Sequence, residues 1–157
     1  MNFKKKFETK LTSLAKSCGW ASKLNPVGLK KLLDSLPENL DPNVLVGYDT
    51  CDDAGVYLLN EEQALVFTAD FITPPVDDPY LFGQIAAANS LSDIFAMGGN
   101  PLTCLNLMGF PSEKLGNEIF ENILAGGLNK ITESGAVLLG GHTTNEDEPK
   151  FGLAVTG

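Results

Sequence analysis

The sequence lacks the features that define several common protein classes. It contains three cysteines and one histidine, and the cysteines do not have the paired spacing of a zinc site. Three free thiols suit a reducing compartment, so a cytoplasmic location is expected. No apolar run is long enough to span a membrane, and a polar stretch follows Lys4 to Lys6 where a signal peptide needs an apolar core. The sequence therefore predicts no membrane partner.

Positive charge is also scarce. The chain has 11 lysines and arginines against 20 acidic residues, which gives a net charge of −9. A field of this sign repels nucleic acid and anionic membranes, so neither is an expected partner. The hydrophobic content of 43% is ordinary for a globular protein, and 157 residues suffice for one domain with a core.

Turn and capping residues divide the chain into strands and helices. Asp78 and Pro79 are typical of a helix start, and Asn25 with Pro26 gives the same signal earlier in the chain. We expect strands over 44–46, 56–59, 64–72, 101–109, 136–140 and 151–156, and helices over 26–36, 79–97 and 112–134, the last one capped by Ser112. This order predicts an α+β fold in which a mixed or antiparallel sheet carries helices on one side. The other sheet face then needs a cover, from a second copy or a further domain.

Carboxylates interrupt three apolar stretches. Asp52 and Asp53 precede a strand, Asp70 lies inside one, and Asp93 lies in an apolar helix pattern. Because a buried carboxylate is costly unless it is neutralised, we expect these side chains to converge on a cation, with Mg²⁺ and nucleotide phosphates as the first candidate. Taken alone, Asp52 and Asp53 also suit an ordinary turn.

Two spacings support this interpretation. Thr68 and Asp70 alternate along a strand and so share a face, and Asn89 and Asp93 are four residues apart on one helix face. A satisfied polar pair or a small-residue packing face would explain the helix spacing equally well. The run from Gly140 to Thr143 at a strand end suggests a turn that contacts phosphate through backbone N–H groups.

These residues resemble a known family, the selenide, water dikinases (selenophosphate synthetases). That family belongs to the superfamily of aminoimidazole ribonucleotide synthetase, thiamine-monophosphate kinase and the hydrogenase maturation dehydratase. The resemblance extends over about residues 11–157. The matching strings are Asp41–Gly47, Asp52–Tyr57, Thr68–Asp70, Asp77–Tyr80, Asn89–Gly99, Leu139–Thr143 and Glu148–Gly157.

The resemblance implies an ATP-dependent enzyme. ATP, selenide and water would give selenophosphate, AMP and phosphate, with Mg²⁺ held by Asp53 and Asp93. Lys23 would be the essential lysine, on a flexible segment that folds over ATP. The remaining implied ATP contacts are Thr50, Cys51, Asp52, Thr68, Asp70, Asp93, Gly141, His142 and Thr143.

The resemblance also implies a domain organisation. Residues 1–24 would form the flexible segment that carries Lys23, and residues 25–157 would form the ATP-binding and dimerisation domain. The sheets of two subunits would join into a barrel, so a homodimer is expected. The C-terminal domain of the family has no counterpart in this chain, and we expect the isolated chain to be inactive.

One position departs from the family pattern. Trp20 stands where members have cysteine or selenocysteine, three residues before the lysine. Cys18 could replace that nucleophile, because a thiolate near Lys23 would be activated by the positive charge. Alternatively, Trp20 stands for a UGA codon that specifies selenocysteine. A third possibility is a divergent ATP-binding dimer without catalysis, and another ATP-dependent member of the superfamily is a fourth.

Overall fold

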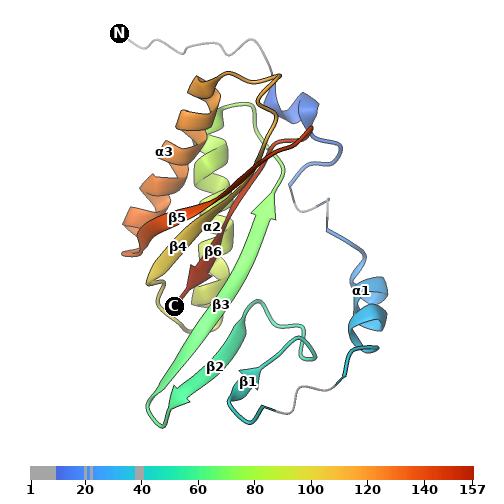
Figure 1. Cartoon of the computed structure of the whole chain (residues 1–157), viewed down its shortest axis with the longest axis vertical. Helices are drawn as coiled ribbons and strands as arrows, with labels where there is room; N and C mark the ends of the chain where they lie inside the picture. The colour runs from blue at the N-terminus through green and yellow to red at the C-terminus, as the bar shows by residue number, and fades with distance from the viewer. Residues whose placement is uncertain (1–9, 20, 22, 38–40) are drawn as a thin grey trace.

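The structure is a computed structural model that describes residues 10–19, 21, 23–37 and 41–157. Its elements follow the order of the predicted ones (Figure 1). The strands are β1 (Val44–Val46), β2 (Gly55–Asn60), β3 (Gln63–Ile72), β4 (Thr103–Phe110), β5 (Val137–Asn145) and β6 (Lys150–Thr156). The helices are the 3₁₀ turn η1 (Leu11–Leu14), α1 (Pro26–Leu33), α2 (Pro79–Ala96) and α3 (Asn117–Glu133).

The six strands form one mixed sheet in the order β1-β2-β3-β6-β4-β5. All neighbouring strands are antiparallel except β4 and β5. These two run parallel and are joined in the chain through α3. Helices α2 and α3 lie side by side on one face of this sheet, while α1 lies apart from them near β1 and β2 (Figure 1). The predicted α+β architecture with helices on one side is therefore confirmed.

The core lies between the sheet and the two long helices. Phe82 of α2 meets Phe151 of β6 edge to face, with ring centroids 6.4 Å apart. Ile94, Ile123 and Leu153 are fully buried around them. Along β3 the residues alternate, because every second side chain of a strand points to the same face. Val66 and Ile72 are buried under α2, while Phe67 and Phe71 are exposed on the other face.

Local signals located α2 correctly. The Asp78 side chain accepts a hydrogen bond from the Leu81 N–H at 2.9 Å, and Pro79 occupies the first turn. Beyond the helix end, Gly98 has a φ of +77°, a left-handed conformation that glycine adopts without strain. The hairpin of β2 and β3 also agrees with the prediction, with Glu61 and Glu62 as its turn.

Two predicted helix boundaries are wrong. Ser112 does not cap α3, because residues 112–115 form a separate turn in which the Pro111 carbonyl accepts from the Leu115 N–H at 3.0 Å. The Ser112 hydroxyl instead donates to Asn145 at 2.9 Å, and α3 begins after Gly116. The predicted helix over 26–36 ends at Leu33 and continues as a turn.

The N-terminal segment contacts the sheet between residues 11 and 19. Leu11 is fully buried, and the Thr12 hydroxyl donates to Asp77 at 2.6 Å. Gly19, with a φ of +52°, forms an isolated antiparallel bridge to Thr73 just beyond β3. Residues 1–9 of the predicted flexible segment lie outside the described residues, and its flexibility stays a prediction.

Candidate functional site

The predicted site residues on β3 and α2 lie against each other. Thr68 and Asp70 are on the helix-facing side of β3, and Asn89 and Asp93 are on the facing side of α2. The Thr68 hydroxyl donates to Asp93 Oδ2 at 2.7 Å, and Asn89 Nδ2 donates to Asp70 Oδ2 at 2.7 Å. Two side-chain hydrogen bonds therefore join the strand to the helix at this place.

Lys23 completes this group, which we call the carboxylate cluster (Lys23, Thr68, Asp70, Asn89 and Asp93). Its Nζ lies 3.2 Å from Asp70 Oδ2, the same oxygen that accepts from Asn89. The Lys23 side chain is 59% exposed and that of Asp70 only 17%. Because solvent reaches the lysine end of this ion pair and screens the attraction, the lysine can exchange its partner.

The electrostatics of Asp93 are unfavourable to its charged form. Burial raises the pKa of the Asp93 carboxyl, and the neighbouring carboxylates of Asp70 and Asp53 raise it further. The hydrogen bond from Thr68 and the charge of Lys23 oppose this shift without cancelling it. A carboxylate that is short of positive charge is the kind of group that a hard cation would satisfy.

The described part of the chain contains no group of three or more histidine, cysteine or acidic side chains arranged to hold a metal ion. The two predicted metal ligands differ in their setting. Asp53 lies exposed in the loop before β2, while Asp93 is half-buried on α2. Phosphate oxygens and water molecules would have to supply the remaining ligands of any Mg²⁺ bound between them.

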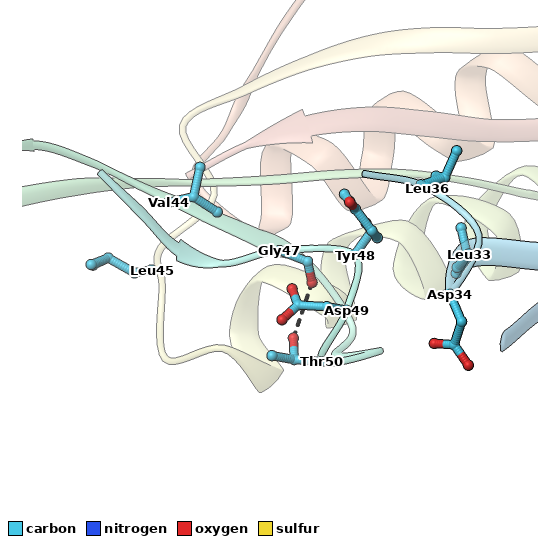
Figure 2. A pocket seen from close by; sticks show the side chains of 9 residues that line it. All are labelled: Leu33, Asp34, Leu36, Val44, Leu45, Gly47, Tyr48, Asp49 and Thr50. Carbon is cyan, nitrogen blue, oxygen red and sulfur yellow. Dashed lines mark hydrogen bonds between the residues drawn. The ribbon is translucent and has the colours of Figure 1, made fainter. Parts of the chain in front are cut away.

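The loop before β2 is exposed and carries the next predicted contacts. Thr50, Cys51 and Asp52 are all exposed, and Cys51 has a φ of +59°. Figure 2 shows the Thr50 hydroxyl directed at the Gly47 carbonyl, which it reaches at 3.0 Å. Thr50 lines a cavity of about 320 Å³ whose walls also include Leu33, Val44 and Tyr48 (Figure 2).

The run from Gly140 to Thr143, which the sequence predicted as a phosphate-contacting turn, is part of a strand. Gly140, Gly141, His142 and Thr143 continue β5, paired in parallel with residues 105–108 of β4. Because β5 is the last strand of the sheet, β4 pairs with the backbone groups on only one of its two sides. Since β6 and β4 lie between β3 and β5, one chain does not bring these residues to the carboxylate cluster.

Cys18 is exposed and anchored beside the end of β3. Its Sγ lies 3.8 Å from the Pro74 carbonyl oxygen, next to the bridge between Gly19 and Thr73. Thr73 is three residues beyond Asp70 along the chain, so the thiol lies beyond the end of the strand that carries the cluster. Trp20, the position that departs from the family, lies outside the described residues.

Sequence reasoning assigned no substrate role to Asn89, although its amide is a direct partner of Asp70. The four-residue spacing to Asp93 was the available signal. Its partner Asp70 was not evident, because the two residues are 19 positions apart in the chain and no local pattern links them.

A family model matches the larger part of the chain. The model for AIR synthase related protein, N-terminal domain, covers residues 51–157. The chain belongs to the AIR synthase related family. The matched domain contains β5, the loop from Cys51 and four residues of the carboxylate cluster (Thr68, Asp70, Asn89 and Asp93), whereas Lys23 precedes it.

The AIR synthase related chain is similar to curated proteins and to solved structures. It is 56% identical over 149 residues to a selenide, water dikinase of Geobacter metallireducens, covering 94% of this chain and 43% of the relative. A second one, of Carboxydothermus hydrogenoformans, is 55% identical over 148 residues, with 94% and 43% covered. The chain thus spans less than half the length of these relatives.

The fold also has a solved counterpart. AaThiL complexed with AMPPCP and TMP superposes with a TM-score of 0.68 at 19% identity, covering 97% of this chain and 44% of that structure. At this identity the likeness shows the fold alone.

No helix in the described ranges is long and apolar enough to cross a membrane.

Proposed function

We propose that this chain is the ATP-binding half of an enzyme that makes selenophosphate from selenide, ATP and water, with release of AMP and phosphate. The observation that supports it most directly is the contact of Lys23 with Asp70, which joins the implied essential lysine to an implied nucleotide contact. The similarity to relatives called selenide, water dikinase over 94% of the chain supports the choice of substrate.

The carboxylate cluster suits phosphoryl transfer, which depends mostly on positioning and charge neutralisation. Lys23 would leave Asp70 for a phosphate group of ATP, since its exposed side chain is held by a single weak ion pair. Asn89 and Thr68 would keep the carboxylates of Asp70 and Asp93 in place during this exchange.

Mg²⁺ fits the donor set of this site. The raised pKa of Asp93, caused by burial and by Asp70 and Asp53, indicates that this carboxylate lacks a compensating positive charge. Asp53 and Asp93 would hold the ion. When bound, Mg²⁺ would neutralise charge on the phosphate groups that are transferred.

We further propose that the active form is a homodimer. The sheet face opposite the helices exposes Phe67, Phe71, Leu105 and Leu139, an apolar surface that a second copy would cover. A partner would also supply a second β5. Residues 141–143 of one copy would then contact the nucleotide that is bound by the carboxylate cluster of the other copy.

Because Cys18, Cys51 and Cys104 are free thiols, we propose that the enzyme works in the cytoplasm.

The main alternative is an ATP-binding dimer without catalysis. Trp20 favours it, since tryptophan cannot act as the nucleophile that handles selenium. If Cys18 replaces that nucleophile, Cys18→Ser abolishes product formation and leaves nucleotide binding intact. Another ATP-dependent member of the superfamily is a second alternative, in line with the fold likeness to AaThiL, which was solved with the ATP analogue AMPPCP.

The test measures Mg·ATP binding and AMP formation with and without selenide, under anaerobic conditions, on the protein as its gene encodes it. We expect AMP to appear only with selenide. Lys23→Ala should weaken binding of ATP by roughly tenfold or more, because it removes a charge-assisted contact to phosphate. Lys31→Ala, which removes an exposed lysine of α1, is the matched control. ATP binding without AMP would favour the non-catalytic dimer.

A further inference from the structure

Ser90 is a fully buried polar residue on the sheet-facing side of α2. Its exposed fraction is 0%, and its hydroxyl oxygen has three partners. The Leu153 N–H donates to it at 3.0 Å, and the hydroxyl lies 2.9 Å from the Asp70 carbonyl oxygen and 3.2 Å from the Ala86 carbonyl oxygen. Because a hydroxyl has one proton, the shorter contact makes Asp70 the main acceptor.

The two sheet partners of Ser90 face each other in the ladder between β3 and β6. Val66 and Gly157 exchange both backbone hydrogen bonds, at 2.8 and 2.9 Å. Such hydrogen-bonded pairs alternate along an antiparallel ladder, so Asp70 and Leu153, four residues further along, form a pair of the same type. The Ser90 hydroxyl therefore binds the backbone donor and acceptor at the one ladder position that carries the Asp70 carboxylate.

Asp70 is thus attached to α2 at two points. Ser90 holds its backbone carbonyl, and the next residue, Asn89, holds its carboxylate at 2.7 Å. Strand β6 also comes very close here. A Cβ on Gly152 would lie 2.0 Å from the Asp70 carbonyl oxygen, so β3 has no space to shift towards it. Helix α2 and strand β6 together determine where this carboxylate lies.

We propose that Ser90 is a positioning residue that acts through Asp70 on the nucleotide site. This inference rests on the proposed function, because the reason for a fixed Asp70 is its exchange of Lys23 with a bound phosphate. Loss of the hydroxyl would remove the hydrogen bonds that tie this ladder position to α2. The strand could then shift relative to the helix, and the carboxylate would move with it.

The first experiment compares Ser90→Ala with Ser92→Ala in the full chain. Ser92 lies on the same helix but is exposed, and its hydroxyl donates to the Asn89 carbonyl at 2.6 Å. We measure the dissociation constant of adenylyl imidodiphosphate with Mg²⁺ by calorimetry. Ser90→Ala should weaken binding about tenfold, and Ser92→Ala should change it less than twofold.

A double-mutant cycle separates positioning from a general loss of stability. If Ser90 acts through Asp70, then Ser90→Ala should weaken binding hardly at all in an Asp70→Asn background. Equal effects of Ser90→Ala in both backgrounds would overturn the proposal. If Ser90→Ala folds too poorly to be titrated, Ser90→Cys retains the size and a weak donor, and its affinity should fall below that of the wild type in the Asp70 background only.

A second readout does not depend on the nucleotide. The side-chain amide protons of Asn89 report on the Asp70 carboxylate, and their exchange with solvent can be followed by NMR. Ser90→Ala should accelerate this exchange and Ser92→Ala should not. If the wild-type chain binds no nucleotide, the proposed function fails at its binding step. The Asn89 signal still decides the role of Ser90, and an unchanged exchange rate would refute it.

Discussion

The close crossing of α2 and α3 gives a prediction whose size follows from the coordinates. A Cβ added at Gly83 would lie 2.0 Å from the Ile123 carbonyl oxygen, and one added at Gly126 would lie 2.0 Å from the Tyr80 carbonyl oxygen. Both distances are far inside the 3.4 Å at which ordinary contacts begin. The obstructing atoms are backbone, so neither helix can yield by rotating a side chain.

Gly126→Ala should therefore lower the free energy of unfolding by about 1–3 kcal/mol, the usual cost of forcing extra atoms into a packed interior. Gly83→Ala should cost a similar amount. The two changes act on the same crossing, so once one alanine has separated the helices the other adds little. We expect the double variant to lose clearly less than the sum of the two single losses.

Urea unfolding followed by circular dichroism measures these differences, and Gly28→Ala is the matched control. Gly28 is also a helical glycine, but a Cβ there would meet nothing within 4 Å. This control should gain about 0.4–1 kcal/mol, because alanine restricts the unfolded chain and favours the helix. A Gly126→Ala variant as stable as the wild type, or strictly additive losses, would refute the close crossing.

Two further predictions concern titration and reactivity. Because the folded-state pKa of Asp93 is raised above its ordinary value of 3.8, the folded chain binds the extra proton and stability falls as the pH rises from 3.8 through the folded pKa. Asp93→Asn should remove this loss. The free energy of unfolding of the variant, relative to that of the wild type, should therefore increase across that window and then stay constant. A relative free energy that decreases with rising pH would contradict the assigned pKa shift. Burial raises the pKa of the Cys104 thiol to about 11, whereas Cys18 and Cys51 are exposed. An aromatic disulfide reagent should therefore titrate two thiols in the folded chain and the third only in denaturant, and three fast thiols would count against the core around Cys104.

Local signals in the sequence were sufficient for much of the fold. The capping pair Asp78 and Pro79 located α2, and two apolar runs joined by a short polar turn located the hairpin of β2 and β3. Both depend on residues that are neighbours in the chain. The start of α3 was missed because Ser112 hydrogen bonds to Asn145, a residue 33 positions away that no local pattern identifies.

For the candidate site too, local spacing predicted some features, while others depend on contacts between distant parts of the chain. The side-by-side positions of Thr68 with Asp70, and of Asn89 with Asp93, follow from strand and helix periods. Their mutual hydrogen bonds depend on how α2 packs on β3, which periodicity does not specify. Residues 140–143 were interpreted as a turn because of their glycines, and only pairing with β4 shows that they extend an edge strand.

The central claim is tested most directly by phosphorus NMR of the protein as its gene encodes it, incubated anaerobically with ATP, Mg²⁺ and selenide. The account predicts a selenophosphate signal with a matching amount of AMP, and the loss of both in Lys23→Ala. ATP bound to the protein without any selenophosphate would contradict the account, and would mean that Trp20 marks a divergent nucleotide-binding protein.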